Sequence, residues 1–297
     1  MLLNLPISLL LVLSILANLA GGILRNQYSK KYEANDRDLW LFLLIGQIGG
    51  FATLLVTSAA FSVSLFTALA AVAFGGVCIA AFALMNKALK IGPMGIFNII
   101  ITSSMLIPAL SGPIGWGEKL TLPTVAGIAG MLLMILLVTA RHQDKKAESG
   151  RFWVYCFIAV LLSGAVGILQ KVHQTSSHRE EIDTFLLIAF SVTILFAAAF
   201  WLRERSKQTP ALVSFSFARA PFWLALCCGV CTSLPHRINL FLSGVMDSAV
   251  FFPLVNGCGL LLSVLAAVLL YKERLTARQT AGVLVGMAAI LLLSGIV

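Results

Sequence analysis

About ten apolar stretches of roughly twenty residues divide this sequence, and they restrict the kind of fold it can adopt. A helix needs about 20 apolar residues to cross the ~30 Å hydrocarbon layer of a bilayer. Only 11% of the residues are charged, against about 25% in soluble domains. The pattern predicts an all-α integral membrane protein surrounded by a lipid bilayer. The expected spans are residues 5–24, 39–57, 62–85, 94–114, 122–140, 152–170, 185–202, 221–244, 249–271 and 277–296.

The connections between these stretches are short, and none is long enough to hold a separate soluble domain. We therefore expect a single membrane domain. The first stretch has no basic residue before it and no evident small-residue cleavage site, so we expect a retained membrane helix and not a signal peptide.

Positive charges are distributed unevenly over the connections. Of the 21 Lys and Arg residues, 17 fall on the side of the connections that follow the odd-numbered spans, counting Arg278, the second residue of the last expected span. Because basic residues collect in loops that face the cytoplasm, this side is expected to be cytoplasmic, with both chain termini outside. We expect a multi-pass protein of the cytoplasmic (inner) membrane. The same rule accounts for the net charge of +9 without a nucleic-acid partner.

A short motif occurs twice in the chain. The sequence WGEKLT begins at Trp116, and the related sequence YKERLT begins at Tyr271. In both copies a glycine follows the threonine by six residues, at Gly127 and Gly282. The spacing between the copies indicates that the chain contains an internal repeat.

A second similarity, between residues 21–32 and residues 166–177, supports the repeat. The two halves are then residues 1–143 and residues 150–297, with five spans in each. Because five is an odd number, the second half would enter the membrane from the opposite side. Two inverted five-helix repeats of this kind are typical of secondary transporters, which bind substrate at the interface between the repeats.

The repeated motif also predicts local structure. Thr121 and Thr276 each precede the last span of their half, where a threonine hydroxyl can accept from a first-turn backbone N–H. Thr276 and Gln279 have the spacing of a capping box. Glu118 and Glu273 are expected to bind backbone donors or to pair with nearby basic residues. We favour this structural role for the motif over a direct role in transport.

The motif and its surroundings resemble the drug/metabolite transporter superfamily, in particular its EamA-type members. GPMGIFNIIITSSMLIPALSGPIGWGEKLT is similar to the fourth span and turn of the first repeat of such proteins. SGVMDSAVFFPLVNGCGLLLSVLAAVLLYKERLT is similar to its partner in the second repeat. The resemblance covers essentially the whole chain and implies ten helices, a central cavity, alternating access and a small metabolite as cargo. The small multidrug-resistance branch uses a glutamate in its first helix, and residues 1–24 contain no carboxylate here.

Polar residues inside apolar spans are costly and mark candidate sites. The eighth span contains Pro235, His236, Arg237 and Asn239. The proline should kink the helix, and irregular backbone is tolerated only against protein or a water-filled cavity. Arg237 either binds a substrate carboxylate or phosphate, reaches toward the interface, or pairs with Asp247. His236 either titrates near physiological pH or stays neutral and donates to a carbonyl.

The fourth and ninth spans occupy corresponding positions in the two halves, and both carry residues that soften a helix. Such a symmetric pair predicts a substrate-binding site, although small and hydroxylated residues also serve helix packing. The residues concerned are Asn98, Thr102 and Pro108 in the first half and Pro253, Asn256 and Gly257 in the second. Further polar candidates for contact with substrate are Asn18, Gln47 and Ser163.

No nucleotide-binding loop, hydrolase motif or set of metal ligands is evident, so no catalytic residue, cofactor or metal is expected. The favoured function is a secondary-active transporter that moves a small polar metabolite, such as an amino acid or another solute with a carboxylate or phosphate. Transport could be coupled to an ion or to a proton, and the sequence does not identify which. The alternatives are a flippase for a lipid or lipid precursor, and, less favoured, a membrane-embedded enzyme or a channel.

Overall fold

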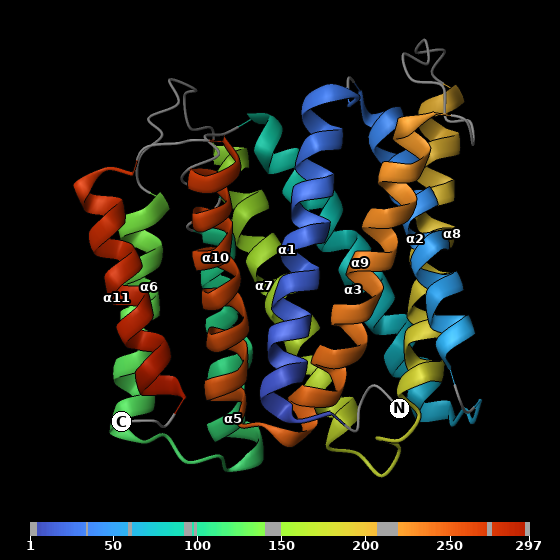
Figure 1. The fold of residues 1–297 in the computed structure, drawn as a ribbon. Helices are drawn as coiled ribbons and strands as arrows, with labels where there is room; N and C mark the ends of the chain where they lie inside the picture. Colours follow the sequence, from blue (N-terminus) through green and yellow to red (C-terminus); the bar gives the residue numbers. More distant parts are fainter. Residues whose placement is uncertain are drawn as a thin grey trace. The chain divides into compact units, whose positions relative to one another are not determined.

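A computed structural model describes residues 5–33, 35–58, 61–91, 97, 100–139, 150–206, 219–271 and 275–294. Within these residues every regular element is helical, as the composition predicts (Figure 1). The helices are α1 (Ile7–Lys31), α2 (Asp36–Thr57), α3 (Leu65–Ile91), η2 (Ser103–Met105), α5 (Leu106–Trp116), α6 (Leu122–Thr139), α7 (Gly150–Gln174), α8 (Ile182–Ser206), α9 (Ala220–Val245), α10 (Ser248–Tyr271) and α11 (Ala277–Leu293).

The fourth expected span, residues 94–114, is interrupted, whereas each of the others coincides with one α-helix. The interruption is the 3₁₀ turn η2, which leads directly into α5. Pro108 explains its position, because a proline has no N–H to donate to the carbonyl of Ser104 and its ring crowds that carbonyl. The corresponding helix α10 stays continuous through Pro253.

Six helices in the described part of the chain are long and apolar enough to cross a membrane, namely α1, α2, α3, α7, α8 and α10. Shorter apolar segments lie in Ile100–Trp116, Leu122–Val138 and Ala277–Leu293. The most polar of the expected spans, in α9, is not among the six. These lengths and compositions suit a helical membrane protein.

The chain forms two compact units. Unit 1 comprises Met1–Ile79 and His173–Phe241, and unit 2 comprises Ala80–Val172 and Leu242–Val297. Each unit therefore combines segments from both halves of the sequence. The boundaries between the units fall inside α3, α7 and α9.

In unit 2, α6 and α11 pack side by side along their length (Figure 1). The glycines of the repeated motif lie in this contact. A Cβ at Gly127, near the start of α6, would lie 2.6 Å from the side chain of Leu293, at the end of α11. A Cβ at Gly282, near the start of α11, would lie 2.8 Å from the side chain of Val138, at the end of α6. The packing is therefore reciprocal: a glycine near the start of each helix contacts a larger side chain near the end of the other.

The two threonines of the motif cap these helices, as the sequence predicts. Thr121 accepts from the backbone N–H of Thr124 at 3.3 Å, just before α6. Thr276 accepts from the N–H of Gln279 at 3.4 Å, and the Gln279 side chain accepts from the N–H of Thr276 at 3.0 Å. The expected capping box is therefore present at the start of α11.

Unit 1 is held together by close approaches of small residues and by stacked aromatic rings. Gly229 of α9 meets Gly46 of α2 so closely that a Cβ at Gly229 would overlap the Gly46 carbonyl. The rings of Tyr28 and Phe42 stack with centroids 4.0 Å apart. Small residues allow membrane helices to approach and gain packing contacts, since the lipid supplies no hydrophobic driving force between them.

Two consecutive glycines in α3 provide a test of this packing. A Cβ at Gly75 would lie 2.7 Å from the carbonyl oxygen of Ala189 and 2.9 Å from Cβ of Val192, whereas one at Gly76 would meet nothing within 4 Å. We expect Gly75→Ala to lower the free energy of unfolding by about 1–3 kcal/mol because it overpacks the contact with α8. Thermal or denaturant unfolding in detergent would measure the loss.

Gly76→Ala is the matched control for that substitution. It should be neutral or stabilise the protein by up to ~1 kcal/mol, because alanine favours a helix over glycine. Equal effects of the two substitutions would show that the α3–α8 contact is not as close as described.

Candidate functional site

Arg237, on α9 in unit 1, forms an ion pair with Asp183 at the start of α8. Its Nη2 lies 2.7 Å from Oδ1 of Asp183 and donates to Oδ2 at 2.9 Å. Its Nη1 donates to the backbone carbonyl of Thr57 at 3.0 Å. The two charged side chains are only 13% and 12% exposed. The charge of Arg237 is therefore balanced within the protein.

Asp247, the ion-pair partner that the sequence suggested for Arg237, is not the partner in the structure. It is exposed, and its carbonyl accepts from the backbone N–H groups of Val250 and Phe251 in the first turn of α10. Asp247 is only ten residues from Arg237 in the sequence, but this short separation does not bring the two side chains together. The observed partner, Asp183, is 54 residues from Arg237.

His236 and Asn239 lie one turn apart on α9, so they share a helix face. Asn239 Oδ1 accepts a hydrogen bond of 2.6 Å from the hydroxyl of Ser14 on α1. The ring of His236 meets Phe74 and Phe190 edge to face, with centroids 6.2 Å and 5.8 Å away. This face of α9 thus carries two half-buried polar side chains, and two phenylalanine rings contact the histidine.

The other predicted residues of unit 1 lie on α1 and α2. The Oε1 atom of Gln47 accepts from the hydroxyl of Thr193 on α8 at 3.1 Å. Asn18 is exposed on α1, in the middle of an apolar helix. An exposed amide in such a helix is expensive against lipid, so a water-filled surface suits it better.

In unit 2 the predicted residues lie on separate elements. Asn256 is exposed on α10 and donates to the carbonyl of Phe252 in its own helix at 2.7 Å. Thr102 is half-buried directly before η2. The hydroxyl of Ser163 on α7 is buried and finds no hydrogen-bond partner in the described part of the chain. Asn98 lies outside the described residues.

A buried carboxylate, Glu118 of the repeated motif, organises one end of unit 2. Its Oε2 accepts from the backbone N–H of Ser248, the first residue of α10, at 2.6 Å. Its Oε1 accepts from the Ser248 hydroxyl at 3.1 Å and lies 2.6 Å from Nζ of Lys171. Lys171 also donates to the carbonyl of Met246 at 3.0 Å. Glu118 therefore binds a backbone donor and a basic residue, as the sequence predicts, but the helix that it caps lies 130 residues away, which the sequence did not indicate. Its counterpart Glu273 lies outside the described residues.

Two glycines give Glu118 this position. Gly117 ends α5 with φ of 65°, in the left-handed region that glycine adopts without strain. A Cβ at Gly112 would overlap the carboxylate of Glu118. Gly112 thus leaves room for the carboxylate, and Gly117 allows the turn that leads to it.

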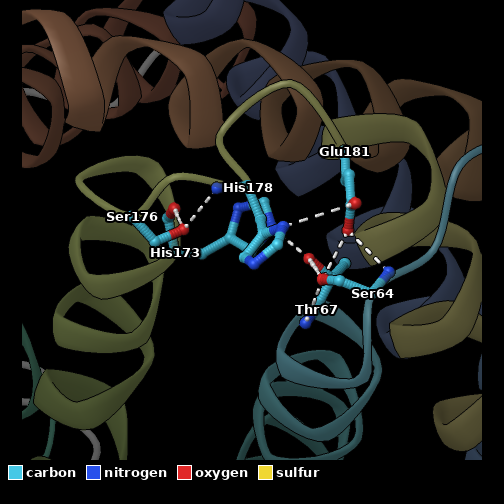
Figure 2. Close-up of polar contacts among 6 residues, drawn as sticks. All are labelled: Ser64, Thr67, His173, Ser176, His178 and Glu181. Atoms are coloured by element: carbon cyan, nitrogen blue, oxygen red, sulfur yellow. Dashed lines mark hydrogen bonds and ion pairs between the residues drawn. The ribbon is translucent and has the colours of Figure 1, made fainter.

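A second carboxylate does the same for α3 in unit 1, as Figure 2 shows. Glu181, in the α7–α8 connection, accepts from both the backbone N–H of Ser64 at 3.0 Å and its hydroxyl at 2.8 Å. Ser64 immediately precedes α3. We call this arrangement, a carboxylate that accepts from the N–H and hydroxyl of one serine at a helix start, a carboxylate clamp.

His173 lies beside the second clamp and is fully buried at the end of α7. Its Nε2 is 3.2 Å from the hydroxyl of Thr67, and its Nδ1 is 3.0 Å from the amide nitrogen of Gln174. That amide nitrogen also donates to the carbonyl of Arg179. Nδ1 is therefore an acceptor, and a neutral His173 carries its proton on Nε2 and donates it to Thr67.

The sequence signal for these clamps was weak. Lys171 and Glu181 stand among polar residues of a short connection and look like solvated charges. The only clue was composition, since the chain has 12 acidic residues and each one placed near a membrane helix needs a partner. Among the described residues no group of three or more metal-ligating side chains occurs.

Comparisons with known proteins leave the family open and bear on the fold. No protein-family model and no curated protein matches the chain. A solved structure described only as "Crystal structure of protein" matches with a TM-score of 0.75 over 98% of this chain and 96% of the other. The two chains are 13% identical, so the likeness extends to the fold alone.

The Glu118 arrangement is the first carboxylate clamp and the Glu181 arrangement the second. The ion pair between Lys171 and Glu118 in the first clamp should stabilise the fold. Lys171→Met would leave the buried Glu118 carboxylate without its counter-ion, which costs about 3–5 kcal/mol. The double variant Lys171→Met with Glu118→Gln should be less destabilised than the two single effects added together. Unfolding in detergent would give all three values.

Lys119→Met is the control for that experiment, because it removes an exposed lysine from the same motif. It should change stability by less than about 0.5 kcal/mol. A Lys171→Met variant as stable as Lys119→Met would contradict the stabilising role of the pair.

Proposed function

We propose that this protein is a secondary-active transporter of the drug/metabolite transporter type, which moves a small polar metabolite across a membrane by alternating access. The proposal includes ten membrane spans in two inverted repeats, as expected from the sequence. Its cargo site would include polar residues of α9 in unit 1.

The observation that carries the proposal is the pairing of helices that belong to expected spans five apart, with η2 and α5 counted together as the fourth span. Three such pairs pack closely, α2 with α8, α5 with α10, and α6 with α11. In an up-and-down bundle, helices separated by five positions run in opposite directions, as inverted repeats require. Gly127 and Gly282 support an inverted repeat as well, because each lies near the start of its own helix and contacts the end of the other. Inverted repeats suit a carrier, in which one half rocks against the other around a site near the midplane.

The polar residues of α9 favour a cargo without a large net charge. Arg237 was the main reason to expect an anion, but Asp183 balances its charge. His236 and Asn239 remain as half-buried polar groups in an apolar helix. A neutral imidazole offers one donor and one acceptor, and the Asn239 amide adds two donors. Such a set suits a neutral or zwitterionic solute with carbonyl or carboxylate oxygens.

A screen of purified protein against metabolites grouped by charge would test this function. A ligand that binds only the folded state stabilises it by about 2.7 kcal/mol at a hundredfold excess over its Kd. We expect neutral or zwitterionic solutes to raise the unfolding temperature. The ligands found should then enter proteoliposomes with saturation, and excess ligand inside should accelerate uptake by exchange.

Substitutions of His236 separate cargo binding from folding. His236→Leu removes the donor and acceptor and should weaken ligand binding about tenfold, or ~1.4 kcal/mol, while His236→Gln should retain much of the affinity. Ser233→Ala is the control, because that hydroxyl is buried and donates within its own helix to Val230. Non-saturating flux would point to a channel. Equal affinity in wild type and His236→Leu would remove α9 from the site.

A further inference from the structure

The two carboxylate clamps differ in the cation beside the carboxylate. In the first clamp Nζ of Lys171 lies 2.6 Å from Oε1 of Glu118. In the second clamp the corresponding side chain is a histidine, which is charged only when protonated. Nδ1 of His178 lies 3.6 Å from Oε1 of Glu181. Histidine is the side chain whose charge changes between pH 5 and 8.

Glu181 keeps its negative charge over that whole range. Hydrogen bonding by Thr67, together with the N–H and hydroxyl of Ser64, lowers the pKa of Glu181 to about 2. A change of charge in this clamp between pH 5 and 8 therefore has to come from a histidine. Of the two nearby histidines, His178 has a side chain that is 39% exposed, whereas His173 is fully buried.

The surroundings of His178 make it accessible to protons and hold it in place. Its backbone N–H donates to the hydroxyl of Ser176 at 3.1 Å (Figure 2). Its ring stacks on Phe66 of α3 with centroids 5.8 Å apart. The titratable or charged groups of this connection are Glu181, His173 and His178, together with the exposed Arg179 and Glu180 that follow His178 in the chain. The neighbouring segments add uncharged side chains, namely Ser64 just before α3, Phe66 and Thr67 in α3, and Phe185 in α8.

We propose that His178 and Glu181 form a proton-binding site in which a proton taken up by His178 strengthens the hold of the α7–α8 connection on the first turn of α3. The proton comes from water and binds the free ring nitrogen, and no other bond is made or broken. The imidazolium then faces the Glu181 carboxylate, which already holds Ser64. The clamp is thus tighter at pH 5 than at pH 8.

The consequence for transport rests on the proposed function. The α7–α8 connection follows the sixth expected span, residues 152–170. The distribution of Lys and Arg predicts that this connection lies outside. An acidic exterior would tighten the clamp and slow any conformational step that requires α3 to part from this connection. The proton is then a regulator of the carrier, bound at a site separate from the polar residues of α9.

Hydrogen exchange tests the proton site without any substrate. The backbone amides of residues 64–68 would be followed from pH 8 to pH 5 in purified wild type and His178→Gln, compared at each pH. The wild type should gain about two- to fivefold in protection relative to His178→Gln as the pH falls, the size expected of a partly exposed ion pair. Equal protection in both proteins at every pH would overturn the proposal.

Two further variants complete the experiment. His178→Lys copies the first clamp, so its protection at residues 64–68 should stay high from pH 5 to pH 8. Glu118→Gln should loosen the first turn of α10 but leave the pH response of α3 unchanged, because it alters only the first clamp. A pH response without uptake in proteoliposomes would reject the transporter and keep the proton site, and uptake without a pH response would do the reverse.

Discussion

The first backbone N–H groups of a helix have no partner within that helix, so each of them needs an acceptor from elsewhere in the protein or from water. This protein places a carboxylate from a distant connection at the start of two helices. Glu118 binds the first residue of α10, and Glu181 binds Ser64 before α3. Each carboxylate thus joins segments more than a hundred residues apart. The connection that carries it is fixed in place by the same bonds, and this arrangement underlies both the stability of the helix ends and the proposed proton site.

The helices and their local signals were accessible from sequence because they depend on neighbours in the chain. The lengths of the apolar runs predicted the α-helices, and the Thr276–Gln279 spacing predicted a capping box that the structure confirms. The 3₁₀ turn η2 follows from Pro108 in the same way. The ten membrane spans and the inverted repeats stay predictions, since six helices in the described part of the chain meet the length and hydropathy that a span requires.

The partners of polar residues could not be predicted, since tertiary structure decides them. Arg237 pairs with Asp183 and not with the nearer Asp247, and Lys171, which resembled an ordinary loop lysine, is 4% exposed. Ion pairs of this kind have no periodicity and no fixed spacing, so a single sequence gives no means of choosing among candidates. Of the predicted site, Asn98 lies outside the described residues.

The contact between α6 and α11 has a consequence for how the sequence can vary. Gly127 faces Leu293, and Gly282 faces Val138, so each helix presents a small residue at its beginning and a larger one at its end. A bulkier residue at either glycine would require a smaller one at the far end of the other helix. The residues that these positions can accept in one half of the chain are therefore tied to those in the other half.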